Sequence, residues 1–242
     1  VRLEGTARFD CAVNGIKRDA WGWILETTQG RVQTKYFINC AGLQADRVTR
    51  LSKIQPKVSI IPFKGKYFLV KPERRQLVKN LIYPVPNPAL PFLGVHFTRT
   101  LDGCLEAGPN AILSLDREGY EDGQVNLRDT CELLFDARWW KMALRYWKMG
   151  FTEMYRNMSK KSFVEELKNL VPSVDEDDLT DGPSGVRAQC VDDNGVLVND
   201  FKIVEAPQAI HVLNVPSPAA TASLAIGNYI ARLATNAFGL RL

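Results

Sequence analysis

The sequence predicts a fold of class α/β plus α+β, and two observations carry that prediction. Near both ends of the chain, a strand-like run leads through small residues into a helix, which is the α/β arrangement. Between them, short strand-like runs are separated by Pro, Gly and Asn-Pro, and helices follow, which is typical of an antiparallel sheet with helices. We therefore expect an α/β domain made of residues 1–55 and 183–242, into which an antiparallel-sheet domain of residues 56–182 is inserted.

The first fifty residues predict three strands and one helix. Strand-like runs cover residues 8–16 and 21–28, and a Gln-Gly turn leads to a third run over residues 31–40. This third run ends in a turn of small residues, after which residues 45–53 show helical periodicity. Ligands commonly bind at such strand ends in α/β proteins.

The central part predicts several strands and then helices. The strand-like runs are residues 57–71, 80–88, 91–100 and 104–113. The last two are joined by Asp102-Gly103, a dipeptide that favours a hairpin tip. Over residues 129–171, apolar residues recur every three or four positions, as they do in amphipathic helices.

The last sixty residues return to the α/β pattern. Residues 185–191 predict a strand that leaves a Gly-Pro turn, residues 192–204 a hairpin, and residues 209–215 an apolar strand of the kind that parallel sheets bury. A final helix follows. This return of the pattern is the reason to assign residues 183–242 to the domain that the first residues begin.

Composition and charge exclude several classes of protein. Hydrophobic residues make up 45% of the chain, as in globular proteins, yet no apolar run approaches the roughly 20 residues that cross a bilayer. The net charge of +4 is spread along the chain, so we expect no nucleic-acid partner. The cysteines form no CxxC motif and the two histidines, His96 and His211, are far apart, so we expect no metal site. The first residues lack the pattern of a signal or transit peptide.

Prolines and very small residues stand just before the last helix: Pro216, Ser217, Pro218, Ala219, Ala220 and Thr221. The prolines fix the turn. The helix start presents unpaired backbone N–H groups and about half a positive charge. Small side chains would let a flat ligand approach this end of the helix. From these residues alone, a helix packed tightly on the sheet is the more common arrangement, and a ligand is the alternative.

Four polar residues are candidates for chemistry. Arg187 lies on a predicted strand among apolar neighbours, where it could bind a carboxylate by two hydrogen bonds or form an ordinary salt bridge. His96 and Thr98 share one face of a strand because side chains alternate, and the histidine is either a base or a core residue. Asn110 lies in a tight turn from which its amide could reach a substrate.

Five segments together resemble the L-2-hydroxyglutarate dehydrogenase/oxidase family, flavoproteins of the D-amino-acid-oxidase-like superfamily. The resemblance extends from about residue 7 to about residue 233, and the run of segments is more specific than any one of them. The segments are IIPFKGKYFLVKP, LIYPVPNPALPFLGVHFTR, DGCLEAGPNAILSLDREGY, GPSGVRAQ and NVPSPAATASLAIG.

The resemblance implies an FAD-binding α/β domain with an inserted antiparallel-sheet substrate domain. It implies FAD-dependent oxidation of L-2-hydroxyglutarate, a small dicarboxylate, to 2-oxoglutarate, with electrons passed to an acceptor such as a membrane quinone. Members are mitochondrial in eukaryotes, and cytoplasmic or associated with the inner membrane in bacteria. Two alternatives stay open: another hydroxy-acid or amino-acid oxidase of the superfamily, and a non-catalytic fragment that lacks flavin.

The resemblance also implies which residues contact FAD. Val13 meets the adenine end through its backbone, Ala41 and Gly42 lie near the pyrophosphate and ribose, and residues 216–221 lie against the flavin ring. The family begins with a GxGxxG turn that holds the pyrophosphate, and these 242 residues contain no GxGxxG. We therefore expect the chain to correspond to the C-terminal portion of the family, without its first third, and to be inactive alone.

The substrate contacts implied by the resemblance involve the four polar candidates. Arg187 aligns with an arginine that binds the substrate carboxylate in related amino-acid oxidases. His96 and Asn110 are the expected catalytic residues, and Thr98 is an expected substrate contact, because these residues lie on strands that should cover the flavin.

Overall fold

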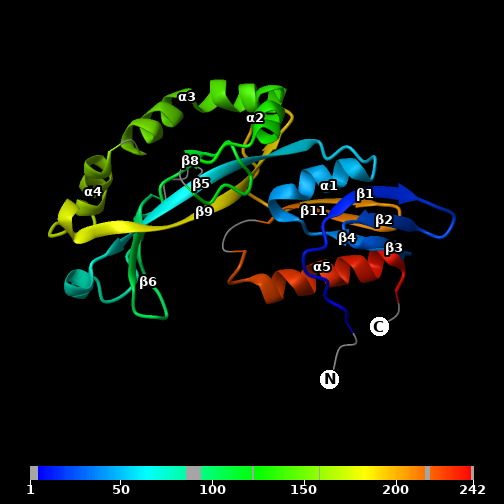
Figure 1. The fold of residues 1–242 in the computed structure, drawn as a ribbon, viewed down its shortest axis with the longest axis horizontal. Coiled ribbons are helices and arrows are strands. Elements are labelled where there is room, and N and C mark those ends of the chain that lie inside the picture. The colour runs from blue at the N-terminus through cyan, green and yellow to red at the C-terminus, as the bar shows by residue number, and fades with distance from the viewer. Residues whose placement is uncertain (1–4, 86–93, 122, 158, 216–218, 241–242) are drawn as a thin grey trace. The chain divides into compact units, whose positions relative to one another are not determined.

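The computed structural model shows two compact units (Figure 1). Unit 1 consists of residues 1–60 and 200–242, and unit 2 consists of residues 61–199. The described residues are 5–85, 94–121, 123–157, 159–215 and 219–240, with the backbone alone over 148–157.

The second division of the chain falls at 199/200, whereas the sequence predicts it at 182/183. The physical reason is strand β9 (Leu179–Asp192), a single 14-residue strand that pairs with β5 (Val58–Val70). Residues 183–192 are therefore part of the sheet of unit 2. The roles of the two units, in binding FAD and substrate, are taken up below as proposals.

Unit 1 contains a three-stranded antiparallel sheet in the order β1-β2-β3. Its strands are β1 (Val13–Arg18), β2 (Trp23–Thr27) and β3 (Gly30–Thr34). Thr27 pairs with Gly30, so a tight turn joins β2 and β3. Gly30 has a φ of 107°, a value that favours glycine, and this explains the Gln-Gly pair at that turn.

A second sheet of unit 1 has the order β10-β11-β4, with β11 antiparallel to β10 and parallel to β4. The 3-10 turn η1 and helix α1 follow β4 along the chain, and helix α5 lies beyond β11 (Figure 1). The bounds are β4 (Phe37–Asn39), η1 (Gly42–Gln44), α1 (Ala45–Leu51), β10 (Lys202–Ala206), β11 (Ala209–Asn214) and α5 (Ser223–Phe238).

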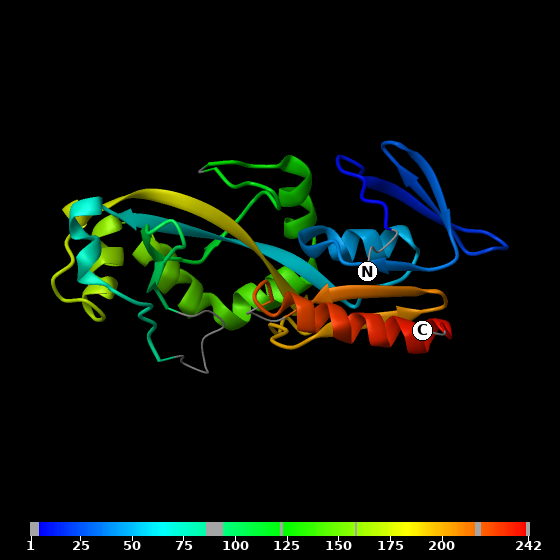
Figure 2. The same cartoon turned by 90° about the horizontal axis from the view of Figure 1, so that it is seen from below.

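The two faces of β11 are buried by different helices. Ala209 belongs to a core cluster with Leu51 of α1, whereas Ile210 and Val212 pack with Leu233 of α5. Figure 2 shows α5 lying along the β10–β11 hairpin. The sequence prediction of a buried strand in a parallel sheet is thus confirmed for this segment, with β4 as the parallel partner.

Unit 2 is built on a five-stranded sheet in the order β6-β7-β5-β8, with β9 also paired to β5. Its remaining strands are β6 (His96–Arg99), β7 (Leu105–Gly108) and β8 (Ile112–Leu113). The β6–β7, β5–β7 and β5–β8 pairs are antiparallel. The antiparallel sheet predicted for the middle of the chain is therefore present, and the mixed fold class is confirmed.

Three helices accompany this sheet: α2 (Leu127–Leu134), α3 (Ala137–Asn157) and α4 (Lys160–Lys168). The α2 helix begins where the Asn126 side chain accepts hydrogen bonds from the backbone N–H groups of residues 128 and 129. Phe163 and Leu167 of α4 pack in one core cluster with Phe97 of β6. Two 3-10 turns, η2 (Pro72–Leu77) and η3 (Glu176–Asp178), complete the unit.

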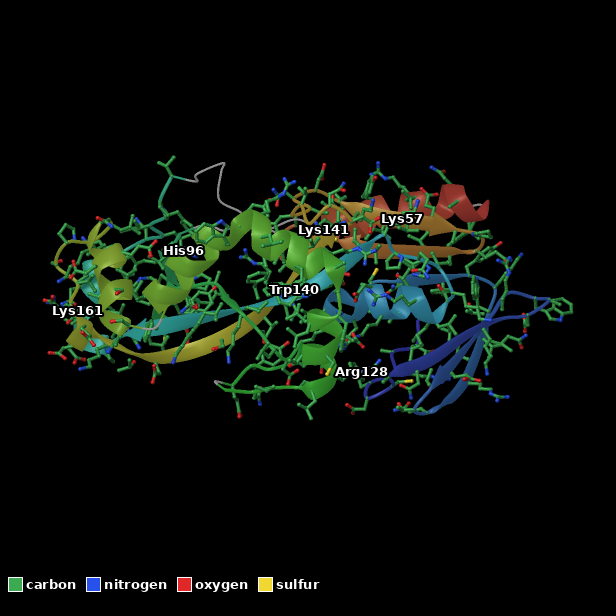
Figure 3. All side chains as sticks on the ribbon, turned by 90° about the horizontal axis from the view of Figure 1, so that it is seen from above. Lys57, His96, Arg128, Trp140, Lys141 and Lys161 are labelled. Atoms are coloured by element: carbon green, nitrogen blue, oxygen red, sulfur yellow. The ribbon has the colours of Figure 1, made fainter. Side chains whose placement is uncertain are left out.

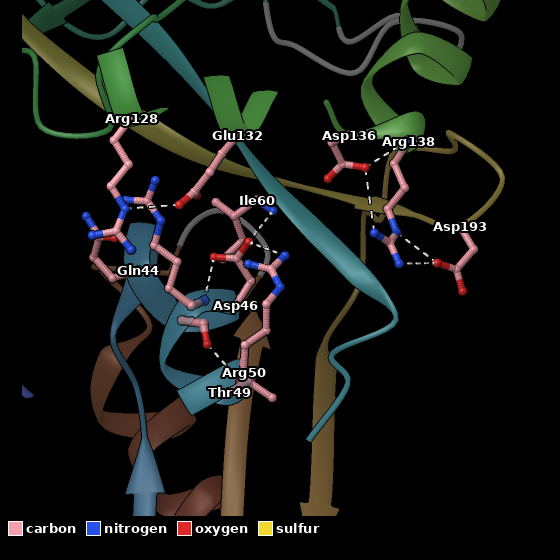
Figure 4. A network of polar contacts seen from close by, with 12 residues as sticks. Gln44, Asp46, Thr49, Arg50, Ile60, Arg128, Glu132, Asp136, Arg138 and Asp193 are labelled. Carbon is pink, nitrogen blue, oxygen red and sulfur yellow. Dashed lines mark hydrogen bonds and ion pairs between the residues drawn. The ribbon is translucent and has the colours of Figure 1, made fainter. Parts of the chain in front are cut away.

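Ion pairs fasten elements within each unit (Figure 4). In unit 2, Arg138 of α3 donates to Asp193, just after β9, with an Nε–Oδ1 distance of 2.8 Å. In unit 1, the buried Asp46 of α1 accepts a hydrogen bond from Arg50 at 3.1 Å and one from the backbone of Ile60 at 3.4 Å. A buried carboxylate with such partners is tolerated, because its charge is compensated.

Three predicted elements differ from the observed ones. The run 31–40 is two strands, β3 and β4, in different sheets, because the chain turns at residues 35–36 and Phe37 donates its N–H to Gln208 instead. Within the described part of 80–88, pairing is limited to an isolated bridge between Ile82 and Phe97. The hairpin predicted over 192–204 is shorter than expected: its turn lies at residues 192–196, where Val191 bridges Leu197, and the chain from residue 202 pairs with β11 instead.

Candidate functional site

The face of the unit 2 sheet that carries His96 and Thr98 is polar, and the opposite face is core. Both side chains are half-buried on alternate positions of β6, whereas Phe97 between them is 1% exposed and packs into the hydrophobic core. The alternation predicted from the sequence is confirmed. It places the imidazole of His96 and the hydroxyl of Thr98 side by side on the face of β6 opposite the hydrophobic core.

The imidazole of His96 is held from two directions (Figure 3 labels His96 on the ribbon). Its Nδ1 lies 3.1 Å from the backbone oxygen of Gly94. The ring of Tyr83 stacks on it with a centroid distance of 4.3 Å and an interplanar angle of 23°. The Tyr83 hydroxyl lies 3.4 Å from Oγ1 of Thr98, so one tyrosine contacts both residues of the pair.

These contacts favour one protonation state of His96. A carbonyl oxygen only accepts hydrogen bonds, so Nδ1 carries the proton and Nε2 of the neutral ring is the proton acceptor. Burial lowers the pKa of His96; the Gly94 hydrogen bond opposes this, and the positive charge of Arg187 adds to the lowering. A neutral imidazole near pH 7 can act as a general base.

Arg187 lies on β9, and its charge reaches this face. It lowers the pKa of His96 and also opposes the rise in the pKa of Tyr67 that burial and Glu106 cause. The neighbours Val186 and Ala188 are apolar as expected, but residues along this part of β9 alternate between exposed and half-buried, and Arg187 itself is exposed. An exposed guanidinium beside a polar face remains suited to a carboxylate.

Two glycines, Gly108 and Gly182, let the neighbouring strands β7 and β9 approach Tyr67 closely. A Cβ added at Gly108 of β7 would lie 3.1 Å from Tyr67 Cα, and one added at Gly182 of β9 would lie 2.8 Å from its carbonyl oxygen. The register of the sheet pairs His96 with Gly108 and Thr98 with Glu106. The sheet therefore brings Tyr67 and Glu106 toward the predicted residues.

Sequence reasoning missed three members of this face: Tyr67, Tyr83 and Glu106. The alternation in the run 104–113 contains a signal for Glu106, which stands between the buried Leu105 and Ala107, and Tyr67 directly precedes the buried Phe68. Tyr83 lies outside the named strands, and only the bridge at the preceding residue places it.

Asn110 has a different local task from the one expected. Its Oδ1 accepts the backbone N–H of Lys66 at 2.8 Å, and its own N–H donates to the Lys66 carbonyl at 3.3 Å. The side chain thus fastens the turn after β7 to β5. A substrate contact of Asn110 stays a prediction.

In unit 1, the turn after β4 is shaped by a buried polar network. Asn39 accepts the N–H of Ala41 at 3.1 Å and donates to the Ala45 carbonyl at 2.8 Å. His211, 0% exposed, lies 3.2 Å from Asn39 Nδ2 and 3.1 Å from Thr49 Oγ1 through its Nδ1. Burial lowers the pKa of His211 to about 4. The ring is therefore neutral and part of the scaffold.

The turn itself is open to a ligand. Ala41 and Gly42 are exposed, and Gly42 has a φ of 52°. Beyond its chain neighbours, a Cβ at Gly42 would meet no heavy atom of the described residues within 4 Å. A small-residue turn at the end of a parallel strand fits the nucleotide part of FAD, since backbone groups are accessible there.

The other predicted cofactor contacts lie in unit 1 as well. Val13 is the first residue of β1, beside a register shift in its pairing with β2. Ala219 is half-buried, and Ala220 and Thr221 are exposed in the turn before α5. Small side chains at an accessible helix start fit a flat ring. Pro216, Ser217 and Pro218 lie outside the described residues.

A family model named DAO, FAD dependent oxidoreductase, matches residues 1–233. The chain belongs to this family. The cofactor of this family is FAD, as the resemblance seen in the sequence implied.

Curated relatives narrow the comparison. The DAO chain is 50% identical over 216 residues to L-2-hydroxyglutarate dehydrogenase of Indibacter alkaliphilus, covering 89% of this chain and 54% of that protein. It is 45% identical over 210 residues to the mitochondrial L-2-hydroxyglutarate dehydrogenase of Dictyostelium discoideum, covering 86% of this chain and 47% of that protein. The chain spans about half the length of these relatives.

Solved structures share the fold. L-alpha-glycerophosphate oxidase from Mycoplasma pneumoniae, determined with FAD bound, superposes with a TM-score of 0.60 at 19% identity, over 93% of this chain and 50% of that one. At this identity the likeness shows the fold alone.

Two further features of the described residues bear on the site. They contain no group of three or more His, Cys, Asp and Glu side chains that could bind a metal ion. None of the helices in this part of the chain has the length and apolar character to span a membrane.

Proposed function

We propose that the whole protein oxidises L-2-hydroxyglutarate to 2-oxoglutarate in an FAD-dependent reaction. The observation that carries this proposal is the identity of 50% and 45% to two proteins named L-2-hydroxyglutarate dehydrogenase. The polar face of unit 2 supports it, because it carries a neutral imidazole on which the charge of the Arg187 guanidinium acts.

Each polar residue has a task that follows from its chemistry. Nε2 of His96 accepts the proton of the substrate hydroxyl, since Nδ1 is held by the Gly94 carbonyl. Arg187 binds a substrate carboxylate through its guanidinium fork and orients the substrate. Thr98 contributes a hydroxyl next to the imidazole, and Asn110 shapes the turn after β7.

The cofactor contacts follow from accessible backbone in unit 1. Val13, Ala41 and Gly42 would hold the nucleotide part of FAD, and residues 216–221 would receive its ring. Bound FAD supplies the chemistry that accepts two electrons and a proton from the substrate. The chain's own contribution is to bind, to orient and to hold the hydroxyl proton at His96.

The electron acceptor and the location of the protein are finer parts of this proposal. We propose a quinone in a membrane, or another acceptor, as the partner that reoxidises the enzyme. One relative carries the word mitochondrial in its name. We propose a mitochondrial location if the source is a eukaryote, and a cytoplasmic or inner-membrane-associated one if it is a bacterium.

The test is a substrate panel on the FAD-loaded whole protein. L-2-hydroxyglutarate should bleach the flavin absorbance and yield 2-oxoglutarate, while D-2-hydroxyglutarate should do neither. Turnover of glycine, sarcosine or glycerol 3-phosphate in its place would favour another oxidase of the same superfamily. A whole protein that binds no flavin would favour a non-catalytic role.

A further inference from the structure

Tyr83 is placed against His96 by the backbone. Ile82 and Phe97 exchange two backbone hydrogen bonds, of 3.1 and 2.9 Å, in an antiparallel bridge. In such a pairing the next residues along the two segments face each other, with their side chains close together. Tyr83 and His96 are those residues, which explains a stacking distance of 4.3 Å.

The tyrosine also has a second anchor. Its hydroxyl lies 3.4 Å from Thr98 Oγ1, on the same face of β6 as His96. The ring therefore has a fixed tilt over the imidazole, and the imidazole is held at one edge by the Gly94 carbonyl and on one face by the ring. The hydrogen bond to Gly94 therefore fixes the tautomer of His96, and the stacked ring of Tyr83 fixes the plane of its imidazole.

A tyrosine that is free to move on the surface would not make both of these contacts, with His96 and with Thr98. Tyr83 is 45% exposed, so burying its ring in a core does not account for its position. The charged or titratable groups that act on this neighbourhood are Arg187 of β9, Tyr67 of β5, Glu106 of β7 and Glu166 of α4, which lies by Gly94.

We propose that Tyr83 is a positioning residue, which stacks on His96 and holds it as the Nδ1-protonated tautomer with Nε2 ready to accept a proton. This rests on the proposed function for its catalytic meaning, and on the contacts above for its geometry. In neutral histidines in water the Nε2-protonated form is the commoner one, so the fixed ring selects the form that a base at Nε2 requires.

The direct test reads the tautomer by long-range ¹H–¹⁵N correlation spectra of the ¹⁵N-labelled protein. This chain has two histidines, so loss of one set of signals in His96→Gln assigns them. His96 should be Nδ1-protonated in the parent protein. Tyr83→Ala should raise the Nε2-protonated fraction at least threefold and move the titration midpoint of His96 toward 6.5, since water reaches the ring. Tyr83→Phe, which keeps the ring, should keep the parent tautomer.

Controls separate this effect from a general loss of structure. Tyr120→Ala removes a tyrosine of similar exposure, 54%, elsewhere in unit 2 and should leave the His96 signals unchanged. Tyr83→Leu keeps apolar bulk without an aromatic ring, and gives the same test if the alanine variant does not fold. A parent-like tautomer and titration midpoint in the folded Tyr83→Ala or Tyr83→Leu variant would overturn the proposal.

Kinetics give a second reading on the FAD-loaded protein. Tyr83→Ala should lower kcat at least tenfold and change KM less than threefold, with recovery in Tyr83→Phe, because the substrate contacts remain while the base is misoriented. If the parent protein does not oxidise L-2-hydroxyglutarate, the proposed function fails, and the tautomer measurement still decides the role of Tyr83. An equal loss in Tyr83→Phe and Tyr83→Ala would contradict positioning by the ring.

Discussion

Arg187 is the cation that the proposed reaction requires beside its base. Arg187→Ala should lower kcat/KM for L-2-hydroxyglutarate at least tenfold, about 1.4 kcal/mol of transition-state binding, and leave the flavin content unchanged. Arg187→Lys should recover only part of the loss, since an ammonium group cannot form the two parallel hydrogen bonds. Steady-state kinetics with flavin absorbance as the occupancy measure check both statements.

The matched control is Arg145→Ala, which removes an exposed arginine from α3 in the same unit. It should keep the parent kcat/KM. Unchanged kinetics in Arg187→Ala would remove Arg187 from the substrate site.

His211 makes the stability of unit 1 depend on pH. Folding lowers its pKa from 6.5 to about 4, so between these values the unfolded chain binds more protons than the folded one. This contribution is complete above pH 6.5 and is lost as the pH falls toward 4. Going from pH 7.5 to 4.5 should therefore cost about 2 to 3 kcal/mol of unfolding free energy through this residue.

Urea unfolding at the two pH values measures the effect, with His211→Gln as the comparison. Glutamine can hydrogen-bond to Asn39 and Thr49 and does not titrate, so its pH-dependent loss should be smaller by that amount. Both proteins have the same carboxylates, so the contribution of these groups to the pH-dependent change in unfolding free energy cancels when the two proteins are compared. An identical loss in parent and variant would show that His211 does not carry the dependence.

At the scale of residues, sequence reasoning finds positions that follow a strand's alternation and misses those set by long-range contact. His96 and Thr98 share a face as expected, because alternation is local. Tyr83 could not be found this way, since its place opposite His96 follows from the bridge between Ile82 and Phe97, which are distant in the sequence. The exposure of Arg187 could not be found either, because it depends on what covers β9.

At the scale of elements, the turn before α5 is a test of whether small residues serve the cofactor or the packing. Ala220 is exposed, so a leucine there meets no packed core within the chain. Ala220→Leu should leave Tm within about 2 °C of the parent, roughly the shift from half a kcal/mol. It should nonetheless lower the flavin content or the activity at least threefold, because the ring needs the close approach.

Absorbance at the flavin bands and thermal unfolding followed by circular dichroism supply the two measurements. Ala231→Leu, at an exposed position inside α5, is the control and should alter neither. Full flavin content and full rate in Ala220→Leu would support packing as the reason for the small residues.

Element boundaries show where local patterns stop being informative. The run 31–40 has a continuous strand pattern, yet the chain leaves one sheet and enters another at residues 35–36. The partner that decides this is β11, more than 160 residues away, which pairs with β4. By contrast, the buried strand 209–214 was predictable, because a short run that is apolar apart from His211 and the terminal Asn214 indicates burial on both faces.

At the scale of the whole molecule, the order of strands and helices predicts an interrupted domain, and the structure has a unit built from both ends of the chain. The exact division could not be predicted. Residues 183–192 continue the strand that begins at residue 179, and a continuous strand cannot leave its sheet midway without a break in pairing. The Gly-Pro pair at 182–183, which suggests a boundary, lies inside that strand.

Residues 1–242 on their own should bind FAD weakly or not at all. A diphosphate is held by the N–H groups at the start of a helix that follows a Gly-rich turn, and the sequence contains no GxGxxG. Helix α1 is a poor substitute, because it has seven residues and an acidic residue, Asp46, in its first turn. We expect a Kd above about 10 μM, or a binding free energy weaker than about −7 kcal/mol, and no turnover of L-2-hydroxyglutarate. Titration of FAD into these residues, followed by quenching of flavin fluorescence, measures the affinity, with FMN as the comparison that lacks the adenosine part. Tight one-to-one binding, or bleaching of the flavin on addition of substrate, would refute this expectation and would mean that the Ala41–Gly42 turn and the start of α5 hold the cofactor by themselves.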